Sequence, residues 1–261
     1  MFTDSHTHLY LDAFSADRDE VITRALEAGV SRMLLPNIDP STSNEVLHMT
    51  DRYPGICLPM MGLHPTSVKG DYKKALSLVE KKLDLPEVIA VGEIGIDLYW
   101  DQTFSEEQEE AFRVQIRWAK ERGLPIVIHA RNSFQEIFRV LDQEGTGGLH
   151  GVFHSFTGSG EELAKALSYG FMIGINGIVT FKNSNLADLV PRIPLEKIVL
   201  ETDAPYLAPV PYRGKRNESS YLVRIAARVA EIYNLTVGEI GEITTRNAKT
   251  MFNLDLRDES R

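Results

Sequence analysis

Eight short apolar runs alternate with helix-like segments along the chain, and this alternation constrains the fold more than any other feature of the sequence. The runs span residues 2–6, 32–36, 56–61, 88–93, 125–129, 150–154, 171–174 and 197–202. Nearly continuous apolar runs of this length are typical of parallel strands that are covered on both faces. We therefore predict an α/β fold, a single (β/α)8 TIM-type barrel, because eight such units close into a barrel more naturally than into an open sheet.

The segments between the runs have helical patterns and recognisable ends. Residues 17–28 and 105–122 are two examples. Ser105 followed by Gln108 predicts a capping box at the start of the second helix. Gly29 and Gly123 stand where a left-handed residue commonly ends a helix.

The length of 261 residues matches one barrel, which commonly needs about 250 residues. No linker, low-complexity stretch or charge block divides the chain. We expect one domain over residues 1–254 and a polar C-terminal tail over 255–261. An open doubly wound sheet is the alternative, although no Gly-rich phosphate loop follows the first run.

The formal net charge of −9 argues against a protein that coats duplex DNA through many phosphate contacts. It still allows an enzyme that takes one phosphate into a local cationic pocket. The single cysteine, Cys57, fits a reducing compartment, and the N-terminal residues lack the pattern of a signal peptide. We expect a cytoplasmic protein with no membrane association and no stable protein partner.

Metal-ligating residue types recur where the predicted strands end. The first run ends in His6-Thr7-His8, and residues two apart on an extended chain point to the same side. Later runs end at or near Glu93, His129, His154 and Asp203. Carboxyl ends of barrel strands share one rim, so we predict a metal site at that rim.

Imidazole and carboxylate ligands together favour a transition metal such as Zn or Mn. Six protein ligands exceed what one catalytic ion usually takes, so we expect two divalent ions, with Glu93 bridging them. In this scheme His6, His8 and Asp203 belong to one ion, and His129 and His154 hold the other. A pair of ions of this kind can activate water and assist displacement at phosphorus.

The motifs around these residues resemble the TatD-type deoxyribonucleases, which are metal-dependent members of the amidohydrolase superfamily. The matching segments are residues 4–9, 62–65, 92–97, 125–131, 154–158, 177–182, 201–207 and 213–218, in order across nearly the whole chain. The family usually has proline where Ser219 stands here, and often cysteine where Ser155 stands.

The resemblance implies a TIM-type barrel that uses a divalent metal such as Mg to cleave phosphodiester bonds in DNA, trimming single strands from the 3′ end. The ligands that it implies are His6, His8, Glu93, His129, His154 and Asp203. A further active-site histidine of the family corresponds to His64. Two Mg, Mn or Zn ions are the expected cofactors, and single-stranded DNA ends are the expected substrate.

Several residues near the predicted rim are candidates for substrate binding. His64 could hold a phosphate oxygen, although a turn histidine without a ligand role is the alternative. Arg131 could bind phosphate through its planar fork or form an ion pair at the rim, with neither reading preferred. The basic group Lys182, Arg213, Lys215 and Arg216 follows the last two runs, where barrels often bind phosphate.

Tyr99 and Trp100 follow the fourth run. They could stack on a nucleobase, or pack on the rim as a lid, and we expect packing.

The expected reaction is metal-assisted hydrolysis in which Asp203 accepts a proton from the attacking water and Glu93 takes part as the bridging ligand. Two alternatives keep the same residues. One is a hydrolase of another ester or amide, for example a D-aminoacyl-tRNA deacylase. The other is a non-catalytic metal-binding barrel. The presence of all six ligands disfavours this alternative.

Overall fold

Each of the eight apolar runs overlaps a strand in the structure, a computed structural model that describes residues 1–254. The strands are β1 (Phe2–Asp4), β2 (Val30–Pro36), β3 (Cys57–Met60), β4 (Val91–Asp97), β5 (Ile126–Arg131), β6 (Gly151–Phe153), β7 (Met172–Ile175) and β8 (Ile198–Leu200). The helices of four or more residues in the α conformation are α1 (Arg18–Glu27), α2 (Ser43–Arg52), α3 (Tyr72–Leu83), α4 (Ser105–Arg122), α5 (Phe134–Glu144), α6 (Gly160–Ser168), α7 (Leu186–Leu189), α8 (Leu222–Tyr233) and α9 (Val237–Met251). Strand and helix therefore alternate through most of the chain, as predicted.

The described chain divides into two compact units. The first unit contains residues 1–35, 49–58 and 173–254, and the second contains residues 36–48 and 59–172. The expectation of a single domain stays a prediction. The expected polar tail, 255–261, lies outside the described residues. Within residues 1–254, no helix is long and apolar enough to cross a membrane.

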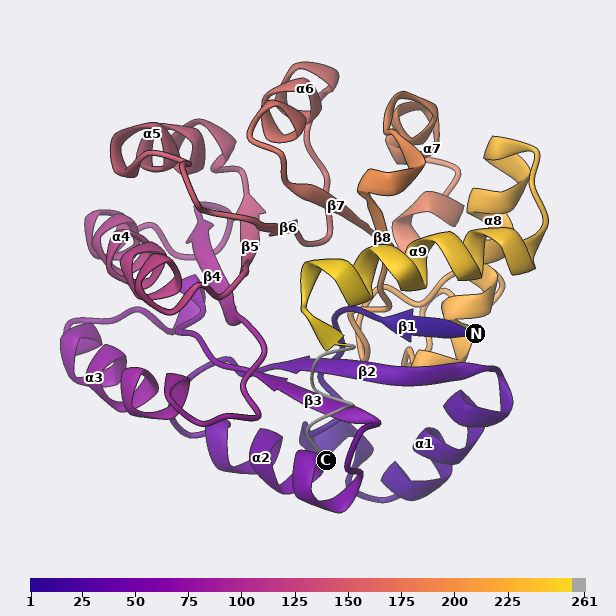
Figure 1. Cartoon of the computed structure of the whole chain (residues 1–261), viewed down its shortest axis with the longest axis horizontal. Helices are drawn as coiled ribbons and strands as arrows, with labels where there is room; N and C mark the ends of the chain where they lie inside the picture. The colour runs from indigo at the N-terminus through magenta and orange to yellow at the C-terminus, as the bar shows by residue number, and fades with distance from the viewer. Residues whose placement is uncertain (255–261) are drawn as a thin grey trace. The chain divides into compact units, whose positions relative to one another are not determined.

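The first unit contains two pairs of parallel strands. β7 pairs with β8 and β1 pairs with β2. The Ser5 N–H donates to the Leu200 carbonyl at 3.0 Å, which connects the end of β1 to β8. Helix α9 packs on β1 and β8 (Figure 1). Gly241 permits this approach, since a Cβ there would lie 2.6 Å from the Phe2 ring.

In the second unit β4 pairs with β5, and β5 with β6, again in parallel. A bridge between Met61 and Val91 joins the end of β3 to β4. Every residue of β4 is buried, as expected of a strand with packing on both faces. Helix α4 packs on β4 and also contacts α3 and α5 (Figure 1).

An aromatic cluster forms the core beside β6 in the second unit. The Phe153 ring centroid lies 5.5 Å from that of Phe171 and 6.0 Å from that of Phe138. Phe134 and Phe156 approach each other edge to face at 5.2 Å. Such pairs add about 0.5–1.5 kcal/mol each beyond the area they bury, so this core holds α5 firmly against the strands.

The predicted capping box at Ser105 is wrong. Helix α4 begins at Ser105, its N-cap is Phe104, and no side chain caps it. Gln108 is instead buried, and its Oε1 accepts a hydrogen bond from the Asp97 N–H at 2.8 Å. The predicted C-terminal cap at Gly123 is confirmed, because this glycine has φ 62° and donates to the last turn.

The sequence pattern predicted that Glu93 ends its strand, and this prediction is wrong. Glu93 is the third residue of β4, which continues to Asp97. The ladder with β5 shifts register between Val91 and Ile94, so the side chains around Glu93 do not follow regular alternation. The continuation brings Gly95 opposite His129, where a side chain could not be accommodated.

We predict that Gly95→Ala strongly destabilises the protein. Gly95 has φ 142°, and an added Cβ would overlap the backbone carbonyl oxygen of His129. The expected loss in the free energy of unfolding is about 3 kcal/mol or more, measured by urea denaturation. Gly147→Ala is the matched control, because a Cβ there meets nothing within 4 Å. Equal stability of the two variants would contradict the prediction.

Candidate metal centre

The first unit brings His6, His8 and Asp203 together, and we call these three residues the Asp203 cluster. His6 and His8 follow β1, and Asp203 follows β8. Backbone hydrogen bonds tie the two segments: the Asp203 N–H donates to the His6 carbonyl at 2.9 Å, and the His8 N–H donates to the Ala204 carbonyl at 2.7 Å. Hydrogen bonds between the two backbone segments therefore fix the positions from which the three side chains extend.

The donor atoms of the Asp203 cluster are spaced as ligands of one ion would be. The Nε2 atoms of His6 and His8 lie 3.3 Å apart. Asp203 Oδ1 lies 3.4 Å from His8 Nε2 and 4.0 Å from His6 Nε2. Two donors about 2.1 Å from the same ion lie roughly 3.0–3.4 Å apart in octahedral or tetrahedral geometry. The separations from His8 Nε2 match this range, and the one between His6 Nε2 and Asp203 Oδ1 is longer. Two imidazoles and a carboxylate gathered in this way form a donor set suited to a divalent metal.

A tyrosine orients one of the imidazoles. His8 Nδ1 lies 2.8 Å from the hydroxyl oxygen of Tyr10, which is almost fully buried. This contact leaves His8 Nε2 directed towards His6 and Asp203. A hydrogen bond to the second ring nitrogen is what usually fixes the orientation of a metal-binding histidine.

Asp4 anchors the loop that carries Asp203. Its carboxylate is fully buried and accepts hydrogen bonds from the Thr202 N–H at 2.9 Å and the Thr202 hydroxyl at 2.6 Å. Asn217 holds the same loop by donating to the Thr202 and Tyr206 carbonyls. Burial raises the pKa of Asp4 to about 7, although these hydrogen bonds oppose the rise.

The second unit gathers three imidazoles around one carboxylate: His64, His129 and His154 surround Glu93, and we call these four residues the Glu93 cluster. Glu93 Oε1 lies 2.9 Å from His129 Nδ1, 3.5 Å from His64 Nε2 and 3.7 Å from His154 Nε2. Both Glu93 and His154 are buried. The cluster comes from four segments of chain: His64 and His154 follow β3 and β6, Glu93 lies within β4, and His129 lies within β5, although the sequence pattern predicted that it ends the strand. Its donor set also fits a divalent metal.

Asp97 contacts the ring nitrogen of His129 that does not face Glu93. Its Oδ2 lies 2.8 Å from His129 Nε2, so each ring nitrogen faces a carboxylate. Burial disfavours the charged imidazole, but the hydrogen bonds to Asp97 and Glu93 outweigh it and raise the pKa of His129 to about 9. Burial likewise opposes ionisation of Asp97, yet the hydrogen bonds from His129, Trp100 and Tyr99 lower its pKa.

A buried glutamine on α4 fixes the loop that carries His64. Gln115 accepts from the Leu63 N–H at 2.6 Å and donates to the Leu63 carbonyl at 3.2 Å. The His64 N–H donates to the Ile38 carbonyl at 2.8 Å, and His64 Nδ1 accepts from the Thr66 N–H at 3.2 Å. Gln108 and Gln115 lie two turns apart on α4, so one helix face supports both His64 and Asp97.

The other residues expected at the substrate are distributed unevenly. Arg131 is half-buried, with its guanidinium 4.0 Å from the centroid of the Tyr99 ring. Lys182, Arg213 and Lys215 are exposed, and none of the three has an ion-pair partner among residues 1–254. The Arg213 guanidinium lies over the Phe181 ring, 4.6 Å from its centroid, and Phe181 is the residue before Lys182.

Arg216 differs from its basic neighbours. It donates to both carboxylate oxygens of Asp17 at 2.7 Å, donates to the Ala13 carbonyl at 2.7 Å, and lies over the Phe14 ring. These contacts attach the loop after β8 to the segment before α1. The role of Arg216 in substrate binding stays a prediction, and its observed contacts are structural.

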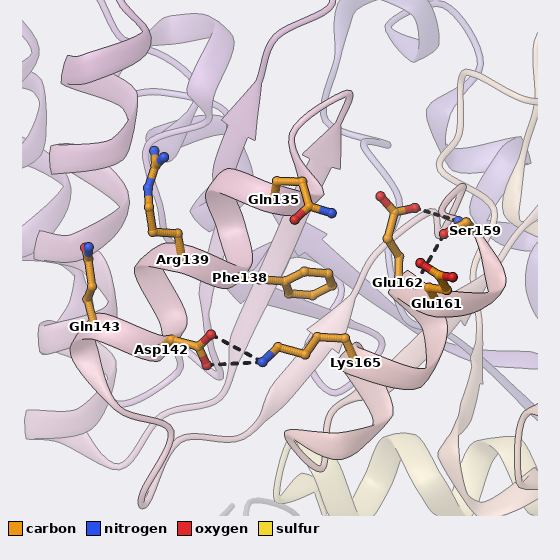
Figure 2. A pocket seen from close by; sticks show the side chains of 9 residues that line it. All are labelled: Gln135, Phe138, Arg139, Asp142, Gln143, Ser159, Glu161, Glu162 and Lys165. Carbon is orange, nitrogen blue, oxygen red and sulfur yellow. Dashed lines mark hydrogen bonds and ion pairs between the residues drawn. The ribbon is translucent and has the colours of Figure 1, made fainter.

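A groove between α5 and α6 in the second unit lies apart from these residues. It is lined by Gln135, Phe138, Arg139, Asp142, Gln143, Ser159, Glu161, Glu162 and Lys165. Figure 2 shows that Asp142 and Lys165 face each other across it, with Nζ to Oδ2 at 3.2 Å. No predicted site residue lines the groove.

Comparison with known proteins shows the family of the chain. The model of the family described as TatD related DNase matches residues 3–253. The chain belongs to this family. It is 36% identical over 256 residues to the uncharacterized metal-dependent hydrolase YabD of Bacillus subtilis, covering 98% of this chain and 100% of that protein. It is 33% identical over 257 residues to the 3'-5' ssDNA/RNA exonuclease TatD of Erwinia tasmaniensis, covering 96% and 99%.

A solved TatD-family structure confirms the predicted fold class. The structure of YJJV, a TatD homolog from Escherichia coli K12, matches with a TM-score of 0.91 and 29% identity over 97% of this chain and 98% of that one. The chain therefore has the α/β fold of TatD TIM-barrel structures, with buried clusters of histidine, glutamate and aspartate.

The residues that support the two clusters were not among the sequence predictions. Asp97 is four residues beyond Glu93, an even spacing that places two strand residues on one face, and this signal was available. Asp4 stands two residues before His6, with the same parity. The only sequence signal that Gln108 and Gln115 are buried was their separation of seven residues, which places both on one face of the predicted helix.

We predict that Asp97→Asn lowers the pKa of His129 from about 9 towards its ordinary 6.5, because the hydrogen bond that the imidazole donates to the Asp97 carboxylate is the largest contribution that raises it. A raised histidine pKa contributes stability that is full below the unfolded value and is lost as pH rises through the folded value. The stability of the metal-free wild type should therefore fall between pH 6.5 and about 9, and the fall should be smaller in the variant.

The measurements are NMR titration of the imidazole and urea unfolding across this pH range. Asp101→Asn is the control, because Asp101 lies in the same loop but is exposed and paired with Lys69. An unchanged His129 pKa in Asp97→Asn would refute the assigned contact.

Proposed function

We propose that this TatD-family metal-dependent hydrolase cleaves phosphodiester bonds of DNA, acting on single strands from the 3′ end. The observation that carries the proposal is the pair of clusters formed by residues in or just after the strands, each with a donor set suited to a divalent metal. Relatives named 3'-5' ssDNA/RNA exonuclease, at 33% identity over nearly the full length, support the substrate class.

The proposed ligands are those expected from the sequence. His6, His8 and Asp203 would hold one divalent ion, and Glu93, His129 and His154 would hold another. Mg, Mn or Zn ions bound there would polarise the phosphodiester and supply a water nucleophile near neutral pH. Glu93 as a ligand shared by two ions stays a prediction from the sequence.

The chain's own groups would handle the proton and the phosphate. Asp203 is partly accessible, with 14% of its side chain exposed, and would accept the proton of the attacking water. His64 Nδ1 accepts from the Thr66 N–H, so in the neutral ring Nε2 carries the proton and can donate to a phosphate oxygen.

Cations without ion-pair partners among the described residues would bind the substrate backbone. Arg131 is the last residue of β5, two residues after His129 of the Glu93 cluster, and Lys182, Arg213 and Lys215 lie in the loops after β7 and β8. Such a local group is compatible with a net charge of −9, because only a strand end has to be attracted.

The proposal predicts metal-dependent release of nucleotides from a 3′-labelled single strand. The test is a panel of single-stranded DNA, duplex DNA, RNA, a D-aminoacyl-tRNA and a phosphotriester, each with Mg, Mn or Zn. Single strands with a free 3′ end should be the best substrates, and blocking that end should abolish turnover. Turnover of only the aminoacyl-tRNA or the phosphotriester would replace the proposed function, and turnover of none would remove it.

We predict that Asp203→Asn lowers kcat at least about 100-fold, because an amide cannot accept the proton of the attacking water. Metal content is measured on the same preparation by elemental analysis, so that loss of ligand and loss of base are separated. Asp188→Asn, on α7, is the control. Wild-type turnover by Asp203→Asn with its metals retained would exclude Asp203 as the general base.

A further inference from the structure

Tyr99 and Trp100 are exposed, in contrast to the packed lid that the sequence suggested. The exposed fraction is 52% for Tyr99 and 67% for Trp100. Their rings meet edge to face with centroids 4.9 Å apart. We call these two residues together with Arg131 the aromatic platform. Large rings exposed to this extent in a loop beside a candidate active site call for a binding partner.

The platform is held in place by the backbone of its own loop. Asp97 Oδ1 accepts from the Tyr99 N–H at 3.0 Å and from the Trp100 N–H at 3.1 Å. The Leu98 N–H donates to the Arg131 carbonyl at 2.9 Å, which fastens the loop to the end of β5. Little conformational freedom remains to be lost from this loop on binding, so a ligand that stacks on it gains most of the contact energy.

Arg131 adds positive charge to the aromatic surface. Its guanidinium lies 4.0 Å from the Tyr99 ring centroid and 5.2 Å from that of Trp100. Among residues 1–254, Arg131 has no ion-pair partner, so its charge is available to a phosphate. A cation combined with exposed rings is the usual composition of a surface that binds single-stranded nucleic acid.

Asp97 connects the platform to the Glu93 cluster. One of its carboxylate oxygens holds the platform loop, and the other holds the ring of His129. Arg131 follows His129 by two residues on β5 and so lies on the same side of the strand. The platform and the cluster are therefore positioned by the same side chain.

We propose that the aromatic platform stacks an unpaired nucleobase of the substrate, with Arg131 on the adjoining phosphate. This inference rests on the proposed function and adds a reason for single-strand preference. A base within a duplex has both faces covered by its neighbours, whereas the platform requires a free face. The residues are positioning residues: they are expected to act on binding and leave the chemical step to the two clusters.

The test uses the fluorescence of the metal-free protein, so that no turnover is needed. Trp100 is exposed and Trp118, the second of two tryptophans, is buried, so a stacked base should quench Trp100 selectively. The probes are an oligothymidylate and an abasic oligomer of equal length and charge. We expect saturable quenching by oligothymidylate, and an affinity for the abasic oligomer about tenfold lower, because an abasic strand has no base to stack on the rings.

Binding of the two probes to variants is followed by fluorescence anisotropy of a labelled strand. Trp100→Ala should bind both oligomers with equal affinity, whereas Trp100→Phe should keep the discrimination because it keeps a ring. Leu78→Ala, an exposed apolar residue of α3, is the matched control and should behave as the wild type. Equal affinity of the wild type for the two oligomers, or discrimination that persists in Trp100→Ala, would overturn the proposal.

Turnover with added metal separates this inference from the proposed function. Nuclease activity without discrimination between the two oligomers would reject the platform and keep the function. Discrimination without any nuclease activity would support the base-stacking surface and reject the function.

Discussion

The parallel pairing of strands whose faces are covered on both sides is the constraint on which the rest of this protein depends. Interior positions of such strands must be apolar, as the fully buried β4 illustrates. Polar chemistry is then concentrated where strands end, because backbone groups there leave the ladder and side chains reach a common edge. His6 and His154 occupy such positions. Glu93 and His129 are exceptions, since Glu93 lies within β4 where the register shifts and His129 lies within β5 opposite Gly95.

Burying polar groups is unfavourable unless they form hydrogen bonds, and the supporting residues supply partners to several members of the clusters. Asp4 holds the loop before Asp203, while Asp97 holds both His129 and the backbone after β4. Gln108 and Gln115 extend the same support from one face of α4. A buried acceptor that loses its donor costs about 1–3 kcal/mol, so these networks also hold the clusters in one arrangement.

Much of the fold and part of the site could be predicted from the sequence, for reasons that particular residues show. Apolar runs indicated all eight strands because buried strand positions require apolar side chains. Gly123 indicated a helix end because glycine, which lacks a Cβ, adopts the left-handed conformation without steric strain. His6 and His8 were identifiable by their spacing of two on an extended chain. The capping box at Ser105 failed because Gln108, whose side chain the motif requires at the helix start, is used to hold Asp97 instead. Local motifs of this kind cannot show which tertiary contact competes for a side chain.

The sequence by itself determined where the strands lie along the chain, the residue types that could bind metal and the family to which the chain belongs. These depend on composition, periodicity and motifs that are local in the chain. Only the tertiary structure decided how the residues are used. It joined Arg216 to Asp17 while leaving Arg213 exposed, and it placed Asp97 between His129 and the loop of Trp100. The physical reason is that a hydrogen bond or an ion pair depends on distance in space, and residues 199 positions apart, such as Asp17 and Arg216, meet only when the chain has folded.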